Sequence, residues 1–284
     1  MPINLILNDI NRILQNHGLS LVLQPHDLLV TPNSVSDALR DGNLSDAITQ
    51  HLWPTVSAAT VCHYTSVAAA ESILKSGVFR LTNIEKRHEH GEIETFCKTH
   101  GLNGYLDPDP KNMGLPKYRS LLMPQLYYAS FTKTNLSSED EEYFWRNFGR
   151  TDGVRLTFEV RAENPNFRKI VYEPSLRAPI PLLFELASTI RQRHKREFIL
   201  GGISRLCAFY LCGKKWAHEQ EYRALFKSWP DGETQPNGSG PNSYIEVPLN
   251  QMTDVGYEFR VVEVHAHYRP NIPNCYPFSK RSQR

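Results

Sequence analysis

A strand, a helix and a second strand follow one another directly between residues 59 and 83. The run ATVCHYTS at 59–66 is rich in β-branched and aromatic residues, which favour a strand. The next run is rich in alanine, and Ser66 in front of it can cap a helix that Gly77 ends. VFRLTN at 78–83 again favours a strand. A chain built around such a segment mixes helices and strands in one core, so the predicted fold class is α+β.

The rest of the chain continues this mixture. Two short strands are expected around Pro25–Asp27, and Ser34 is expected to cap a short helix. The polar residues 84–124, rich in Gly, Pro, Asn and Asp, predict a long and partly helical insertion. Further strands are expected at 125–134, 153–160, 168–173, 221–227, 243–248 and 259–268. Helices are expected at 3–17, 44–53, 137–149 and, interrupted by two glycines, across 180–212.

Length and composition predict a globular protein with one large domain and an appendage. The chain has 284 residues, of which 40% are hydrophobic and 22% charged, which is ordinary for a folded protein. We expect residues 1–56 to form an N-terminal appendage of helices and strands, and residues 57–284 to form the main domain. The net charge of +2 is too small to indicate nucleic-acid binding on its own.

No stretch of about 18 apolar residues is present, and the first residues lack the basic leader of a signal peptide. The five cysteines have no zinc-binding or redox spacing, so reduced thiols are expected. These features predict a soluble cytoplasmic protein that does not bind membranes.

Three clusters of histidine or charged residues can be interpreted either as ligand-binding sites or as ordinary structural or surface residues. HEHGEIE at 88–94 holds metal-ligand side chains, but it lies in a polar insertion where a solvated charged surface is expected. His265 and His267 share a strand face without an evident third ligand, which favours a structural role. RQRHKR at 191–196 would suit phosphate or RNA, yet helices commonly turn basic residues outward. We therefore predict no metal site.

A pair of glutamates, Glu219 and Glu221, begins the run EQEYRALFK. On a strand, residues two apart leave the same face, so these two like charges are expected side by side. Taken alone, such a pair is most often a solvated outer face. A functional role for the pair is supported by two earlier strand motifs, HYT at 63–65 and SFT at 130–132. It is also supported by WRNFG at 145–149, which is followed by Gly153-Val154.

In this order the motifs resemble those of the ADP-ribosyltransferase superfamily. They are most similar to a bacterial domain family of unknown function with H-Y-T/S, S-F-T/S and E-x-E-Y-R motifs. The resemblance covers residues 60–226, and the N-terminal region and the insertion near 84–124 lie outside it. It implies a split, twisted β core with a NAD cleft and helices at the periphery.

The resemblance also implies roles for individual residues, with NAD as co-substrate and no metal. Glu221 would stabilise the positive charge that forms on the ribose, and Glu219 would orient or deprotonate the acceptor. Arg223 would reach the pyrophosphate or pair with a glutamate. A His-Tyr motif combined with a serine motif leaves open which residue touches which part of NAD. The implied NAD-binding residues are His63, Tyr64, Thr65, Tyr128, Ser130, Phe131, Thr132 and Arg223.

The function implied is that of an NAD-dependent mono-ADP-ribosyltransferase, a glycosyltransferase acting on a protein or nucleic-acid acceptor. The implied setting is a bacterial toxin, effector or antiviral defence system, with an antitoxin or immunity protein as a further partner. Two alternatives stay open. One is a NAD glycohydrolase, with water as the acceptor. The other is a non-catalytic module that binds a nucleotide, or a nucleic acid through the basic run at 191–196.

Overall fold

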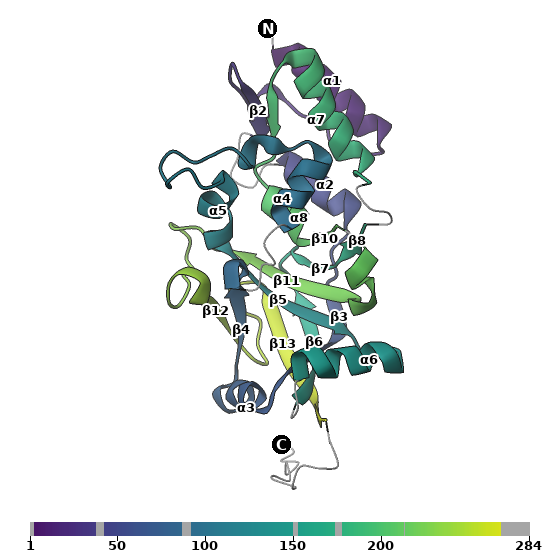
Figure 1. Cartoon of the computed structure of the whole chain (residues 1–284), viewed down its shortest axis with the longest axis vertical. Helices are drawn as coiled ribbons and strands as arrows, with labels where there is room; N and C mark the ends of the chain where they lie inside the picture. Colours follow the sequence, from purple (N-terminus) through teal and green to yellow (C-terminus); the bar gives the residue numbers. More distant parts are fainter. Residues whose placement is uncertain are drawn as a thin grey trace.

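The chain forms an elongated molecule with helices at both ends of a central sheet (Figure 1). α1 and α7 lie at one end, and α3 and α6 lie at the other. The computed structural model describes residues 3–37, 43–86, 92–149, 153–173, 178–212 and 214–267.

The helices form where apolar residues recur at helical spacing between capping residues. α1 buries Ile6, Ile10 and Ile13 along one face. The Ser66 side chain accepts a hydrogen bond from the Ala69 N–H at the start of α3, and Gly77 ends that helix with φ +67°. The helices in the described ranges are α1 (Ile3–Asn16), α2 (Asn43–Leu52), α3 (Val67–Ser76), α4 (Glu92–His100), α5 (Lys117–Leu121), α6 (Ser138–Phe144), α7 (Pro181–His194) and α8 (Ile203–Ala208).

The strands coincide with the runs of β-branched and aromatic residues and with some shorter segments. In the same ranges they are β1 (Leu28–Val30), β2 (Ser34–Asp37), β3 (Ala58–Ser66), β4 (Val78–Asn83), β5 (Leu126–Lys133), β6 (Gly153–Ala162), β7 (Phe167–Lys169), β8 (Val171–Tyr172), β9 (Glu197–Ile199), β10 (Tyr210–Leu211), β11 (Glu221–Lys227), β12 (Tyr244–Pro248) and β13 (Tyr257–Ala266).

One large sheet dominates the described part of the chain. Its eight strands run in the order β12-β4-β5-β3-β6-β13, with β11 on β5 and β7 on β11, and every pairing is antiparallel. Two small sheets, β1-β2-β9 and β10-β8, contain parallel pairs. The sheet curls and helices lie around it, so the predicted α+β class is confirmed (Figure 1).

The sheet splits along one edge of β5. Residues 127–128 pair with β4, whereas residues 132–133 pair with β3. The opposite edge of β5 pairs with β11 along the whole of 126–132. β4 and β3 therefore share one edge of β5 and diverge beside its middle, where Ser130 lies. This split positions the pocket described below.

Two main hydrophobic clusters hold the molecule together. One lies between the large sheet and α3 and includes Phe79, Phe158 and Phe259. The other joins the first 53 residues, the insertion and the α7–α8 region in a single cluster, to which Ile10 and Phe96 belong. The insertion is thus packed into the core. The domain boundary near residue 56 stays a prediction.

Some predicted elements are wrong. Ser34 begins β2 and caps no helix, because Val35 pairs with Phe198 of β9 in a parallel sheet. Residues 19–24 form no strand, and Pro25–Asp27 is a 3₁₀ turn before β1. The region 180–212 contains β9 and β10 in addition to its helices. The errors at Ser34 and in the region 180–212 lie where pairing with a distant segment outweighs the local preference.

Candidate active site

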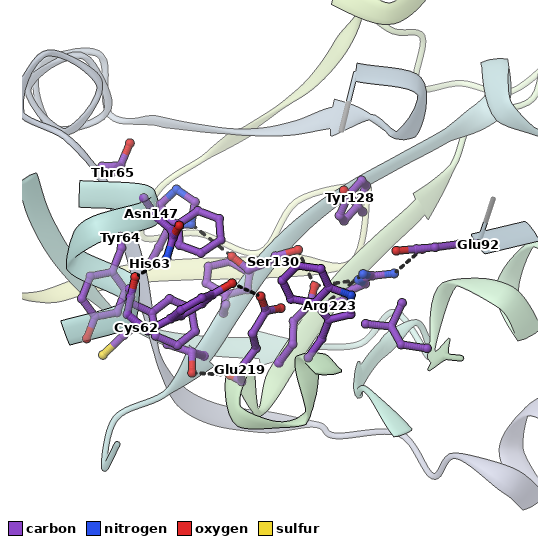
Figure 2. Close-up of a pocket in the computed structure, with 18 residues that line it drawn as sticks. Cys62, His63, Tyr64, Thr65, Glu92, Tyr128, Ser130, Asn147, Glu219 and Arg223 are labelled. Atoms are coloured by element: carbon purple, nitrogen blue, oxygen red, sulfur yellow. Dashed lines mark hydrogen bonds and ion pairs between the residues drawn. The ribbon is translucent and has the colours of Figure 1, made fainter. Parts of the chain in front are cut away.

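A pocket of about 650 Å³ lies beside the split in the sheet. β3, β5 and β11 contribute residues to it, as do α4, α6 and the turn before β11 (Figure 2). Its lining combines three carboxylates, one guanidinium, one imidazole and several aromatic rings. The residues are Cys62, His63, Tyr64, Thr65, Glu92, Tyr128, Ser130, Phe131, Thr132, Tyr143, Phe144, Asn147, Phe148, Leu211, Trp216, Glu219, Glu221 and Arg223.

Glu221 is a buried carboxylate, 5% exposed, at the start of β11. Ser130 lies opposite Arg223 in the register of β5 and β11, so its hydroxyl reaches the neighbouring Glu221. Ser130 Oγ donates a hydrogen bond of 2.5 Å to Glu221 Oε1. Arg223 Nε donates to the same oxygen at 2.7 Å, and Arg223 Nη2 donates to Oε2 at 3.2 Å. The carboxylate is thereby fixed in orientation and compensated in charge.

The two oxygens of Glu221 are not equivalent. From the described residues, Oε1 accepts two hydrogen bonds, whereas Oε2 accepts one, from Arg223. A carboxylate oxygen can accept two. Oε2 therefore keeps one acceptor position for a ligand.

Arg223 is buried and contacts groups on three elements. Its Nη1 donates to the carbonyl of Ala208, the last residue of α8, at 2.8 Å and lies 3.8 Å from Glu92 Oε2 on α4. Its guanidinium carbon lies 5.2 Å from the centre of the Tyr128 ring. Burial opposes its charge, but Glu221 and Glu92 together raise the pKa of Arg223 above its ordinary value. Figure 2 shows the Glu92 side chain directed toward Arg223.

The prediction that Glu219 and Glu221 stand side by side on one strand is wrong. Glu219 ends the 3₁₀ helix Lys214–Glu219, and Gln220 has φ +44°, a left-handed conformation uncommon outside glycine. The kink sends the two side chains into separate surroundings. Glu219 Oε1 accepts a hydrogen bond from Tyr143 Oη at 3.0 Å, while the Glu219 carbonyl accepts one from Thr132 Oγ1 at 2.7 Å.

His63 bridges the split. Its Nδ1 lies 3.1 Å from the Ser130 carbonyl oxygen, where β5 has no backbone partner on that edge. The ring also packs edge-on against Phe79 and Phe131. His63 therefore ties β3 to the strand that carries Ser130, and it lines the pocket as it does so.

Aromatic rings form one wall of the pocket. Tyr64 stacks on Phe144 with ring centres 5.1 Å apart and meets Trp145 edge-on at 4.8 Å. Phe144 in turn stacks on Phe148, which is 46% exposed at the rim. Burial raises the pKa of Tyr64 to about 12, so its hydroxyl stays protonated at neutral pH. This wall offers flat apolar faces to a planar ligand.

The structure brings together every residue that the sequence singled out for catalysis or NAD binding. They all line the one pocket. Tyr127, which precedes Tyr128 on β5, does not line the pocket, and its hydroxyl bonds Pro124 and Ser243 instead. The catalytic and NAD-binding roles of the lining residues stay predictions. The predicted residues gathered there are His63, Tyr64, Thr65, Tyr128, Ser130, Phe131, Thr132, Glu219, Glu221 and Arg223.

Several lining residues carried no signal of this site in the sequence. Tyr143 comes from the helix that was expected only as a structural element, and Asn147 and Phe148 belong to the WRNFG motif, which had no assigned role in the site. Glu92 was noted as part of a metal-ligand cluster, yet it faces Arg223, and Glu94 pairs with Lys98. The other residues of that cluster, 88–91, lie outside the described ranges.

The other two candidate clusters have structural contacts. His265 and His267 flank the Trp145 ring, at 5.9 Å and 4.6 Å between ring centres. In the basic run at 191–196, the three arginines bond carboxylates or backbone carbonyls of neighbouring segments. These bonds join Arg191 to Glu197 and Gly101, Arg193 to Asp9, and Arg196 to Thr31.

Within the described ranges, no helix has the length and apolar character needed to cross a membrane. Among the same residues, no group of three or more His, Cys, Asp or Glu is placed to hold a metal ion. No protein-family model matches the chain, and neither a curated protein nor a solved structure matches it.

Proposed function

We propose that this protein is an NAD-dependent mono-ADP-ribosyltransferase with Glu221 as its catalytic residue. The main support for the proposal is the burial and hydrogen bonding of the Glu221 carboxylate in the pocket. Its carboxylate is buried, oriented by Ser130 and Arg223, and left with one acceptor position on Oε2. A fixed carboxylate of this kind suits a reaction in which positive charge develops on a sugar.

The arrangement of the sheet supports the same proposal. The resemblance in sequence implies a split β core, and here β3 and β4 diverge beside Ser130. The three motifs HYT, SFT and EQEYR, which are far apart in the sequence, meet at this point. The pocket volume of about 650 Å³ is in the range of small-molecule sites.

In the proposed reaction, the bond between the nicotinamide nitrogen and the ribose C1′ breaks. Nicotinamide leaves with the bonding electron pair and becomes neutral, and positive charge develops on the ribose. Glu221 Oε2 stabilises this charge or accepts a hydrogen bond from a ribose hydroxyl. An acceptor nucleophile then forms the new bond to C1′ and gives up its proton.

Glu219 is proposed to act on the acceptor. Its side chain approaches the pocket from the turn before β11, separated from Glu221 by the kink at Gln220. The Tyr143 hydroxyl holds one of its oxygens. A carboxylate fixed in this way can orient an acceptor or take its proton. His63 and the aromatic wall around Tyr64 are proposed to contact NAD.

Labelled NAD added to a bacterial lysate tests the proposal. The wild-type protein is expected to transfer label to a macromolecule, and Glu221→Gln to transfer at least 100-fold less. Glu246→Gln is the matched control, because Glu246 is exposed on β12 and pairs with Arg80 at the surface. Protease and nuclease treatment of the product then shows whether the acceptor is protein or nucleic acid.

Each remaining outcome has a defined meaning. Rapid nicotinamide release without any labelled macromolecule would show that the protein is a NAD glycohydrolase and not a transferase. Neither labelled product nor nicotinamide would reject both enzymatic functions. Equal transfer by the wild-type protein and Glu221→Gln would show that Glu221 is not a catalytic residue.

A further inference from the structure

Three charged side chains that line the pocket form a triad. Arg223 is placed between two carboxylates, Glu221 on its own strand and Glu92 on α4. Glu221 and Arg223 are each 7% exposed at the side chain, while Glu92 is 30% exposed at the edge of the pocket. One guanidinium therefore serves two carboxylates, and the triad carries an excess of one negative charge.

The contacts of Arg223 divide between the two carboxylates. Nε and Nη2 face Glu221, whereas Nη1 faces the Ala208 carbonyl and Glu92. Since the guanidinium is planar and rigid, a group that holds Nη1 also fixes the orientation of Nε and Nη2. The Ala208 carbonyl holds Nη1 by a hydrogen bond, and Glu92 at 3.8 Å acts on it through charge.

The packing of α4 places Glu92 beside Arg223. Glu92 is the first residue of this helix, whose inner face is buried through Ile93, Phe96 and Cys97. This helix belongs to the insertion at 84–124, outside the part of the chain that carries the sequence motifs. Glu92 is thus an addition to the site that the motifs do not contain.

We infer that Glu92 is a positioning residue that acts through Arg223 to keep Glu221 oriented and the pocket floor negatively charged. This inference rests on the proposed transferase function. Without Glu92, the Glu221–Arg223 pair is neutral and Arg223 loses one of its restraints. The negative charge that stabilises a developing positive charge on the substrate is then reduced.

Two measurements test the inference, and the first needs no NAD. In ¹⁵N-labelled protein, the Nε–Hε cross-peak of Arg223 is assigned by its absence from Arg223→Lys. Glu92→Gln is expected to shift this peak, and Glu94→Gln is expected to leave it in place. Glu94 is the matched control because it lies on the same helix, pairs with Lys98 and does not line the pocket. An unmoved peak in Glu92→Gln would overturn the inference whatever the enzyme does.

The second measurement is the rate of nicotinamide release. Glu92→Gln is expected to lower kcat about tenfold with KM for NAD changed less than twofold, because the contact acts on charge development. Glu92→Asp keeps the charge and is expected to recover most of the rate, while Glu94→Gln has the wild-type kcat. A wild-type kcat in Glu92→Gln would overturn the positioning role. If the wild-type protein releases no nicotinamide, the proposed function fails and the catalytic role fails with it, while a shifted peak still establishes the contact.

Discussion

Glu221 and Arg223 form a buried ion pair between residues two apart on β11, with Arg223 Nε 2.7 Å from Glu221 Oε1. Their side chains leave the same face of the strand, which lets one guanidinium contact both carboxylate oxygens. The pair stabilises a charged carboxylate at the floor of the pocket. It also makes each partner depend on the other.

Arg223→Met is expected to destabilise the protein by about 3–5 kcal/mol, because it leaves the Glu221 charge buried without its partner. Urea unfolding followed by circular dichroism measures the change. The double variant Arg223→Met with Glu221→Met is expected to recover much of the loss. Arg80→Met is the control, since its pair with Glu246 is exposed and contributes below about 1 kcal/mol. A loss below 1 kcal/mol for Arg223→Met would contradict this account of the pair.

Ser130→Ala is expected to slow nicotinamide release roughly 10- to 100-fold, because Glu221 Oε1 loses its 2.5 Å donor. The contact of His63 is to the Ser130 carbonyl, so the substitution leaves the link between β3 and β5 intact. Little change in unfolding midpoint is therefore expected. Ser76→Ala, at the exposed end of α3, serves as the control. An unchanged rate in Ser130→Ala would show that orientation by this hydroxyl is unimportant.

Much of the fold could be predicted from local sequence. The strand at 58–66, the helix that follows it and the strand at 78–83 have strong propensities and clear capping residues, and the structure contains all three. Ser34 was misassigned because β2 is stabilised by pairing with β9, some 160 residues later in the chain. A local sequence pattern does not indicate pairing with a strand so far away in the chain.

The sequence predicted which residues would form the site but not how they are arranged in space. The three motifs identified the residues that meet in the pocket, because strands adjacent in a sheet bring distant residues together. A left-handed backbone conformation is usually signalled by glycine, but position 220 is a glutamine. The kink there, which separates Glu219 from Glu221, was therefore not predicted. The approach of Glu92 to Arg223 depends on how the insertion packs, which the sequence alone does not specify.

Tyr143→Phe is expected to reduce ADP-ribose transfer about fivefold while nicotinamide release changes less than twofold, because water then takes the ADP-ribose that no longer reaches the acceptor. The substitution removes the hydroxyl that holds Glu219 Oε1 but keeps the ring that packs on Phe144 and His218. Parallel assays of labelled acceptor and free nicotinamide separate the two effects. Tyr127→Phe removes a hydroxyl outside the pocket and is expected to affect neither. An equal loss in both assays would place Glu219 in bond cleavage instead of acceptor binding.

Asp37 is expected to make the protein less stable as the pH rises from about 4 to 7. Burial raises the pKa of this carboxyl from its ordinary value of 3.8 to about 6, against the hydrogen bonds from Ser45. A raised pKa means that the folded state holds the proton more tightly, so stability is full below 3.8 and is lost as the pH passes 6. At about 1.4 kcal/mol for each pH unit, the loss is on the order of 3 kcal/mol.

Asp37→Asn removes this titration, so the stability of the variant relative to the wild-type protein is expected to rise between pH 4 and 7. Urea unfolding at several pH values measures the difference. Asp107→Asn is the control, because Asp107 is exposed and its pair with Lys117 is at the surface. A constant difference between Asp37→Asn and the wild-type protein across this pH range would contradict the assignment.

The proposed role of Glu221 is tested most directly by nicotinamide release from NAD, with bacterial lysate supplying the acceptor, by the wild-type protein and by Glu221→Gln under identical conditions. Glutamine keeps the shape of Glu221 and its place beside Ser130 and Arg223 but removes the negative charge that the proposed reaction needs. The account predicts measurable release by the wild-type protein and a rate at least 100-fold lower for Glu221→Gln, with Glu246→Gln unchanged. Release at the same rate by all three proteins, or by none of them, would contradict it.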